Sequence, residues 1–341
     1  MKWYRLLLCL LIMLLTTACR KELCYEHEEH AMRVRLDIKA DWETIWERDY
    51  GCNWSSCWNS DWGCNYDDLC PVPATGIRSL VYNSDGSVYD ERNFLANGGR
   101  LYLAEDTYSF LFYNNDTEYI VYDGLEKIAT AVATTRSLTR NTFTALHQSE
   151  RTVSPPDMLY GHFVEQFEGQ LSDKAHEYSI VMKPLVYTYL IRYEFNAGLQ
   201  YVGLARGALA GMAKSVYLHD GHTGSEPATL LYDCTIEEYG AEARVMTFGV
   251  PNHPDEFYNR GEEQKKQHYT LNLEVRLTNG EFKNFFFDVT DQIMTQPRGG
   301  VIVVSGLEVT DDEGKQHESE GGGFDIGLEG WGDAIDVPLP L

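Results

Sequence analysis

The sequence lacks the short motifs that mark several common enzyme classes. It contains no Gly-x-Ser-x-Gly elbow, no His-Glu-x-x-His pair and no phosphate-binding loop, which are signatures of serine hydrolases, zinc proteases and nucleotide-binding proteins. Positive charge is also scarce, because 28 Lys and Arg residues stand against 52 Asp and Glu residues, a net charge of −24. Such an acidic surface repels nucleic acid. We therefore expect a protein that is not an enzyme and has no nucleic-acid partner.

The N-terminal apolar run is too short to cross a membrane as a stable helix, which needs about 20 residues. Lys2 and Arg5 precede this run, which extends over 6–15, and small residues follow it up to Cys19. A basic flank, a short apolar core and small residues at the cut are typical of a secretory signal peptide, here residues 1–18. Its removal takes away two basic residues and no acidic one, which leaves 26 basic against 52 acidic side chains, a net charge of −26.

The end of the signal peptide resembles the lipobox of bacterial lipoproteins. Thr17 and Ala18 precede Cys19, although Thr16 stands where the lipobox usually has a large aliphatic residue. The resemblance implies that Cys19 carries lipid, that residues 19–30 form a lipidated tether, and that the protein is held at the outer membrane. Whether it faces the surface or the periplasm stays open. Simple secretion and a retained membrane anchor are the alternatives.

The rest of the chain has little helical patterning and many short strand-like runs. Apolar residues alternate with others along 31–38, as in a strand with one buried face. Asp85-Gly86 predicts a hairpin turn after 77–82, and Asn279-Gly280 predicts another between 268–277 and 282–289. Only 203–213 favours a helix or a tight coil. The amphipathic helices that a parallel α/β protein needs are absent, so the pattern predicts an all-β protein built of β-sandwiches.

Length and composition predict two domains. The 323 residues after the signal peptide exceed the roughly 150 residues of one domain. Residues 129–154 are poor in bulky apolar side chains and end at two prolines. We therefore expect an N-terminal sandwich over 31–140 and a C-terminal sandwich over 155–341, with a last strand near 334–339.

A segment rich in tryptophan and cysteine, residues 41–75, interrupts the N-terminal strand pattern like an insertion. It contains five of the seven tryptophans and four cysteines. Three readings stay open: a disulfide-stapled loop with tryptophan as its local core, an aromatic platform that binds glycan or a host protein, and a zinc site, although the cysteine spacings do not match zinc knuckles. The disulfide candidates are Cys52, Cys57, Cys64 and Cys70, and the candidate binding residues are Trp54, Trp58, Trp62 and Tyr66.

Other candidate ligands are few. Cysteine use favours an oxidising compartment, since six cysteines remain beyond Cys9 and Cys19. His27 and His30 could hold a metal ion, but a solvated charged linker beside a lipid tether explains them as well. We expect no catalytic residue, no metal and no cofactor.

Several short motifs occur in an order that resembles a known group of proteins. After the lipobox come Cys19-Arg-Lys-Glu-Leu-Cys24, then Pro156-Asp-Met-Leu-Tyr-Gly161, Leu209-Ala-Gly-Met-Ala213 and Thr247-Phe-Gly249. Together they resemble an uncharacterised family of bacterial lipoproteins allied to the fimbrillin-like and fimbrial-anchor (type V pilus) superfamily. The resemblance implies two tandem transthyretin-like Greek-key β-sandwiches, pilus subunits as partners, and a role as pilus anchor or accessory subunit, or in surface adhesion.

One departure from that group bears on the role. Its polymerising subunits are cut after an Arg near the end of the first strand, whereas Arg33 and Arg35 fall inside the predicted strand. Arg136 and Arg140 lie in an open loop much later in the chain. An uncleaved, membrane-held anchor therefore fits better than a shaft subunit. A glycan- or protein-binding surface lipoprotein is the alternative, and an unrecognised hydrolase is the third possibility, because a catalytic carboxylate pair is spatial and leaves no sequence signal.

Overall fold

The computed structural model describes residues 33–47, 53–62, 64–137, 150–254 and 268–315. The predicted signal peptide, Cys19, the tether with its histidines, Cys52 and the predicted last strand fall outside these ranges. Within them the regular secondary structure is almost entirely strand, which confirms the all-β prediction. No helix in these ranges has the length and apolarity that a membrane crossing requires.

The strands run in chain order as follows: β1 (Val34–Trp42), β2 (Gly76–Asn83), β3 (Val88–Leu95), β4 (Gly98–Leu103), β5 (Thr107–Asn114), β6 (Ile120–Asp123), β7 (Val132–Thr135), β8 (Thr152–Val153), β9 (Tyr160–Glu168), β10 (His176–Pro184), β11 (Tyr187–Ala197), β12 (Val202–Ala213), β13 (Ser215–Tyr217), β14 (Pro227–Glu237), β15 (Gly240–Thr247), β16 (Thr270–Leu277), β17 (Phe282–Asp288) and β18 (Gly300–Glu308). The helices are short: α3 (Trp54–Cys57), α6 (Thr290–Met294), α7 (Asp311–Gly314) and the single turns η1 (Ser60–Trp62), η2 (Tyr66–Leu69), η3 (Ile128–Thr130) and η4 (Leu199–Tyr201).

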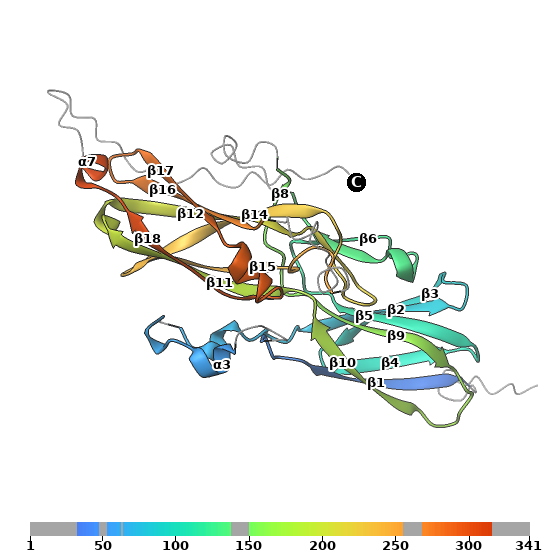
Figure 1. Cartoon of the computed structure of the whole chain (residues 1–341). Helices are drawn as coiled ribbons and strands as arrows, with labels where there is room; N and C mark the ends of the chain where they lie inside the picture. Colours follow the sequence, from blue (N-terminus) through green and yellow to red (C-terminus); the bar gives the residue numbers. More distant parts are fainter. Residues whose placement is uncertain (1–32, 48–52, 63, 138–149, 255–267, 316–341) are drawn as a thin grey trace, which may run out of the picture.

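Seven strands close into a barrel in the order β1-β10-β9-β5-β2-β3-β4 (Figure 1). β1 closes the ring, since it pairs antiparallel with β4 on one side and parallel with β10 on the other. The alternating apolar face predicted over 31–38 points inward, with Val34, Leu36 and Ile38 at most 2% exposed. They pack against Phe110 and Phe112 from β5 in the barrel core.

A second sheet folds over itself into two layers in the order β17-β16-β12-β14-β15-β11-β18. β14 joins the layers, because it pairs with β12 along most of its length and with β15 only over Thr235–Glu237. We call the layer of β14, β12, β16 and β17 the upper layer, and that of β15, β11 and β18 the lower layer (Figure 1). The apolar core between them includes Leu209 and Leu273 from above and Ile191 and Ile302 from below.

A three-stranded sheet, β13-β7-β6, bridges the barrel and the two-layered sheet. Apolar side chains from both sides bury against it, including Tyr82 and Tyr113 of the barrel strands, Ala133 of β7 and Phe248 beyond β15. Because one apolar cluster includes residues from all three sheets, they pack together as a continuous structure.

The sheets do not follow chain order, and the predicted domain ranges stay a prediction. β9 pairs with β5, and β10 pairs with β1 and β9, although both strands fall within the predicted C-terminal sandwich 155–341. β8, in the segment before Pro155, already pairs with β14 of the second sheet, so the chain touches that sheet once before it returns to the barrel and then adds β11 after Pro184. The parallel pairing of β1 with β10 joins segments about 140 positions apart, so no local pattern reveals it.

The expectation of a helix or tight coil over 203–213 is wrong, because these residues form the central strand β12. β12 lies between β14 and β16 in the upper layer. Close packing explains the glycine at position 207, because a Cβ there would lie 2.1 Å from the ring of Tyr232. Both predicted hairpin turns are confirmed, as Gly86 N–H donates to the carbonyl of Asn83 and Gly280 N–H to that of Leu277.

Candidate functional site

The described residues of the tryptophan-rich segment, 41–75, include short capped turns that follow the end of β1. The side chain of Asn53 accepts a hydrogen bond from the backbone N–H of Ser56 at the start of α3. Asn65 and Asp68 form a reciprocal capping box at η2. Such caps satisfy the free N–H groups of helices too short to be stable alone. The sequence predicted the composition of this segment but not these turns.

The aromatic side chains of the segment pack against one another. The ring of Trp58 lies 5.1 Å from that of Trp62, 5.7 Å from that of Tyr66 and 6.2 Å from that of Trp46. Trp54 lies 5.8 Å from Trp62. Edge-on and tilted contacts of this kind stabilise beyond area burial alone. The predicted binding residues are thus brought together, and each of them is half-buried.

This aromatic cluster covers the outer face of the lower layer. Trp46 is 5% exposed, and it shares an apolar cluster with Leu190 of β11 and Val301 of β18. The indole N–H of Trp54 donates to the side-chain oxygen of Gln296 at 3.0 Å. The indole N–H groups of Trp46 and Trp58 donate to backbone carbonyls inside the segment, those of Tyr66 and Cys64. These three indole N–H groups, which a ligand could otherwise use, are therefore already hydrogen-bonded within the protein.

A buried arginine of the lower layer lies beneath the cluster. Arg192 is 2% exposed, and its Nη1 donates to the carbonyl of Trp62 at 2.8 Å, to the hydroxyl of Tyr239 at 2.8 Å and to Glu242 at 2.6 Å. Its guanidinium also lies 3.8 Å from the centre of the Tyr239 ring. Burial and the hydrogen bond to Glu242 raise the pKa of Tyr239 above its ordinary value, so the phenol keeps its proton. These contacts of Nη1 offset part of the free-energy cost of burying the Arg192 charge.

Glu47 organises the other side of the segment. Its carboxylate accepts hydrogen bonds from the backbone N–H groups of Trp54 at 2.5 Å and Ser55 at 3.1 Å, and from the hydroxyl of Tyr66 at 2.7 Å. Burial first, and then this hydrogen bond, raise the pKa of Tyr66. Sequence reasoning missed both Glu47 and Arg192, since neither stands in a recognisable motif.

The three described cysteines of the segment differ in exposure: Cys57 is exposed, Cys70 half-buried and Cys64 buried, and these three are free thiols in the structure. Burial raises the pKa of Cys64 and Cys70, which favours the thiol over the thiolate. Among the described residues, no three His, Cys, Asp or Glu side chains gather as metal ligands would. The disulfide assignment, which includes Cys52, stays a prediction.

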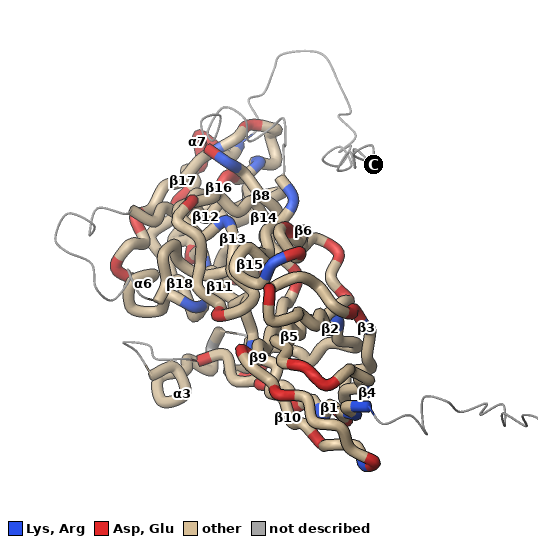
Figure 2. The backbone as a smooth tube through the Cα atoms, turned by 90° about the vertical axis from the view of Figure 1, so that its right-hand side faces the viewer, with Lys and Arg blue, Asp and Glu red and all other residues tan. Residues whose placement is uncertain are grey.

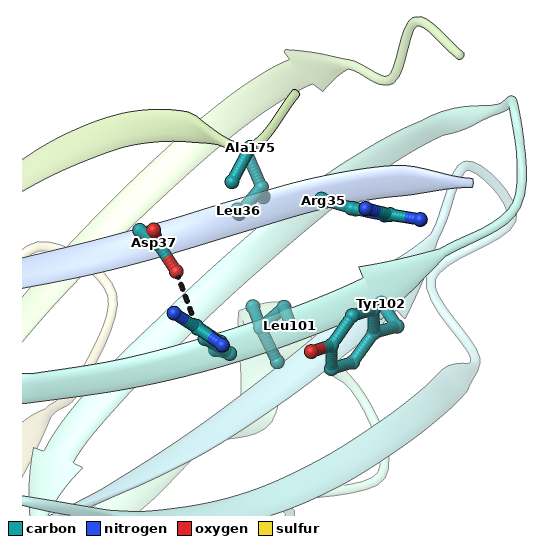
Figure 3. Close-up of a pocket in the computed structure, with 7 residues that line it drawn as sticks. Arg35, Leu36, Asp37, Leu101, Tyr102 and Ala175 are labelled. Carbon is teal, nitrogen blue, oxygen red and sulfur yellow. Dashed lines mark hydrogen bonds and ion pairs between the residues drawn. The ribbon is translucent and has the colours of Figure 1, made fainter. Parts of the chain in front are cut away.

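A second candidate is a hollow on the outer surface of the barrel between β1 and β4 (Figure 3). Arg35, Asp37, Arg100 and Tyr102 line it, and Asp37 accepts a hydrogen bond from Arg100 at 2.8 Å. A glycosidase-type reaction needs two carboxyl groups that flank the bond to be cleaved. This hollow is lined by one carboxyl group, that of Asp37, and it is paired with Arg100. The hydrolase possibility gains no support here.

Charge is spread over the described part of the chain, with Asp and Glu on the barrel and on the two-layered sheet alike (Figure 2). Neither candidate surface is a concentrated acidic or basic patch. The tryptophan-rich cluster is therefore suited to apolar and aromatic contact, and its main evident task is to cover the lower layer.

Comparison with known proteins adds a family and a fold. The family model described as a domain of unknown function (DUF5119) matches residues 61–233, just over half of the 341 residues. Its range begins inside the tryptophan-rich segment, so residues 41–60 lie outside it. A curated relative from Bacteroides ovatus, a candidate fimbrium anchoring subunit named Fim4B, is 22% identical over 328 residues, which cover 90% of each chain.

A solved structure shares the fold, and another is reported beside it for its similarity alone. A crystal structure of a candidate adhesin from Bacteroides ovatus has a TM-score of 0.58 at 18% identity, covering 86% of this chain and 96% of that chain. The fimbrial anchor protein Mfa2 from Porphyromonas gingivalis has a TM-score of 0.44 at 9% identity, covering 80% and 90%. The resemblance to the fimbrial-anchor group, predicted from the order of short motifs, is confirmed.

Proposed function

The chain belongs to the family described as a domain of unknown function (DUF5119), and from this premise we propose that it is a non-enzymatic anchor or accessory subunit of fimbriae in the cell envelope. The observation that carries the proposal is the relative named as a candidate fimbrium anchoring subunit, which matches along 90% of both chains. Pilus subunits are the partners that this role implies. Surface adhesion is the related role, in line with the candidate adhesin that shares the fold.

The position of the first strand supports an uncleaved anchor. Arg35 lies within β1, and Arg33 stands directly before it, in a bridge to Ser172. β1 is paired along both of its edges, and its inward side chains are part of the barrel core. Removing it would expose that core. A subunit that keeps its first strand suits an anchor better than a subunit that must lose it to polymerise.

We further propose that lipid on Cys19 holds the protein at the outer membrane after removal of residues 1–18. A tether over 19–30 would then join the lipid to β1. The two-layered sheet and the barrel correspond in this proposal to two tandem transthyretin-like units, with β9 and β10 assigned to the first. Support comes from the lipobox-like sequence and from the acidic surface, which gives no electrostatic attraction to anionic lipid headgroups.

The test compares Cys19→Ala with the matched control Cys24→Ala in cells that carry the fimbriae. We expect Cys19→Ala to move the protein from the membrane fraction to the soluble fraction and to release fimbriae into the medium. Cys24→Ala should leave both in place. If Cys19→Ala makes the protein soluble but the fimbriae stay attached to the cells, the lipidation of Cys19 is supported and the anchor role is contradicted. If the protein stays in the membrane, the lipid assignment fails. Protease treatment of intact cells distinguishes surface from periplasmic display.

A second candidate function is capture of glycan or a host protein by Trp54, Trp58, Trp62 and Tyr66. The observation that favours it is their gathering into one partly exposed aromatic cluster. Glycan-array binding by the mature protein that disappears when the three tryptophans are changed to Ala would support it. An array without binding leaves the cluster with a structural role alone.

A further inference from the structure

The last strand of the lower layer, β18, lies at one end of the two-layered sheet. Among the described strands it pairs only with β11. The backbone N–H and C=O groups of successive residues in a strand point to opposite edges, so every second residue of β18 directs both groups away from β11. A free edge of this kind can accept a strand from another chain, and proteins usually protect it.

The opposite end of the same sheet is protected by charge, whereas β18 is not. β17 carries Lys283 and Asp288, and charged side chains on an edge strand discourage pairing with another chain. β18 has no charged residue from Gly300 to Leu307, and residues 301–304 are all β-branched. An uncharged run with such high β-propensity tends to associate with itself. The edge of β18 therefore needs another form of protection.

Two glutamine side chains occupy the free edge of β18. The amide nitrogen of Gln292 donates to the carbonyl of Val303 at 3.0 Å, and its side-chain oxygen accepts a hydrogen bond from the Val303 N–H at 3.0 Å. Gln296 makes the same two hydrogen bonds with Val301, at 2.6 Å to the carbonyl and 2.9 Å from the N–H. A primary amide offers a donor and an acceptor as a peptide group does. Each glutamine thus takes the place of one residue of a neighbouring strand.

The spacing of the two glutamines matches the spacing of the strand. Gln292 lies in α6, and Gln296 follows two residues after the end of that helix, where its N–H still donates to the carbonyl of Ile293. Four residues of a helix advance about 6 Å, and two residues of a strand advance about 6.6 Å. Side chains four positions apart can therefore reach backbone groups two positions apart. Figure 2 shows α6 beside β18.

Further contacts hold Gln296 in place. It is 2% exposed, and its backbone carbonyl accepts a hydrogen bond from the hydroxyl of Tyr189 at 2.5 Å. Its side-chain oxygen accepts another from the indole N–H of Trp54 at 3.0 Å. A Cβ at position 300 would lie 1.9 Å from that oxygen, so the glycine there lets the amide reach the strand. The lower layer and the tryptophan-rich segment thus both help to keep this amide at the edge.

We propose that Gln292 and Gln296 substitute for a neighbouring strand and prevent β18 from pairing with β18 of a second copy of this chain. The second copy is the partner that the edge itself fits, because an antiparallel pair of identical strands is self-complementary about a two-fold axis. This inference does not depend on the fimbrial role. The alternative is that the two glutamines only attach α6 to the sheet, so that their loss lowers stability and leaves the protein monomeric.

The test measures self-association of the full mature chain, produced without lipid, by sedimentation velocity. The variants are Gln292→Met alone and Gln292→Met with Gln296→Met, since methionine keeps the side-chain length but lacks the amide. We expect the variants to form dimers, with association strengthened about tenfold or more over the wild type, because a free β edge is opened. The matched control Gln200→Met changes an exposed glutamine of η4 and should behave as the wild type. Circular dichroism shows whether each variant stays folded.

A second substitution locates the contact. Ser305→Lys places a charge on β18, and Asn284→Lys places the same charge on β17 at the other end of the sheet, both at exposed positions. Added to Gln292→Met, Ser305→Lys should restore the monomer and Asn284→Lys should not. Dimers that survive Ser305→Lys would overturn the proposal, and so would folded glutamine variants that stay monomeric at every concentration. If the double variant does not fold, Gln292→Met alone decides the outcome, since Gln296 then keeps its contacts.

Discussion

Arg192 donates a hydrogen bond of 2.8 Å to the carbonyl oxygen of Trp62, which precedes it by 130 positions. This contact joins the segment that follows β1 to the lower layer of the two-layered sheet. Because the same guanidinium also serves Tyr239 and Glu242, one side chain fixes the tryptophan-rich segment to the lower layer.

We expect Arg192→Met to lower the free energy of unfolding by about 3 kcal/mol, since removing the buried arginine leaves the partly buried carboxylate of Glu242, 16% exposed, without its counter-charge. The control is Arg100→Met, which removes an arginine whose side chain is 67% exposed and should cost under about 1 kcal/mol. Urea unfolding followed by tryptophan fluorescence measures both. Equal small losses in the two variants would mean that Arg192 does not hold the segment.

Trp46 and Ile45 are neighbours with opposite environments, 5% and 59% exposed. Trp46→Ala should cost about 3 kcal/mol or more, because it removes a large buried ring and leaves a cavity against Leu190. Ile45→Ala should change stability by about 0.5 kcal/mol at most. Limited proteolysis would show cleavage within 53–70 for Trp46→Ala only. Cleavage of both variants at the same rate would contradict this account of the cluster.

Gly207 and Gly203 offer a matched pair in β12. A Cβ at position 207 would overlap the Tyr232 ring, whereas at position 203 it would meet only the carbonyl of Arg276 at 3.4 Å, an ordinary contact. Gly207→Ala should therefore destabilise the protein by about 1–3 kcal/mol through overpacking. Gly203→Ala should be neutral or stabilise it by a few tenths of a kcal/mol. Thermal unfolding distinguishes them, and a neutral Gly207→Ala would show that Tyr232 can move aside.

The Glu313 carboxylate should make stability depend on pH below about 4.5. Hydrogen bonds from Lys283 and from Thr310 lower its pKa from 4.5 to about 2. Since the unfolded chain binds this proton more readily, the contribution is complete above pH 4.5 and is lost as the pH falls toward 2. Glu313→Gln should lower Tm at pH 6 and differ less from the wild type near pH 3. The exposed Glu281→Gln is the control, and a Tm difference that does not shrink toward pH 3 would contradict the assignment.

The sequence predicted the two hairpin turns, because a turn depends on residues that are neighbours in the chain. Asp85-Gly86 and Asn279-Gly280 each mark a hairpin, since glycine there adopts positive φ without strain. The error over 203–213 has the same origin: alanines and glycines suggest a helix or coil locally, and the tight approach of the Tyr232 ring to Gly207 appears only when β14 is in place.

The sequence was enough to predict which aromatic residues form the candidate site, but not the residues of the lower layer that hold it in place. The sequence placed Trp54, Trp58 and Trp62 in one segment, and the structure brings their rings together. Arg192 and Glu242 are far from that segment in the chain and belong to no motif. Their role depends on the pairing of β11 with β15, which no single stretch of sequence encodes.

The placement of β1 has a mechanical consequence. Its backbone is hydrogen-bonded along both edges, to β4 and to β10, over most of its nine residues. A force applied to the chain just before Val34 pulls along the strand axis, and the hydrogen bonds run across that axis. Both rows of bonds would then resist shear together and would not open one at a time like a zipper. If the chain is held by lipid on Cys19, the first strand is the point where tension on a fimbria enters the fold.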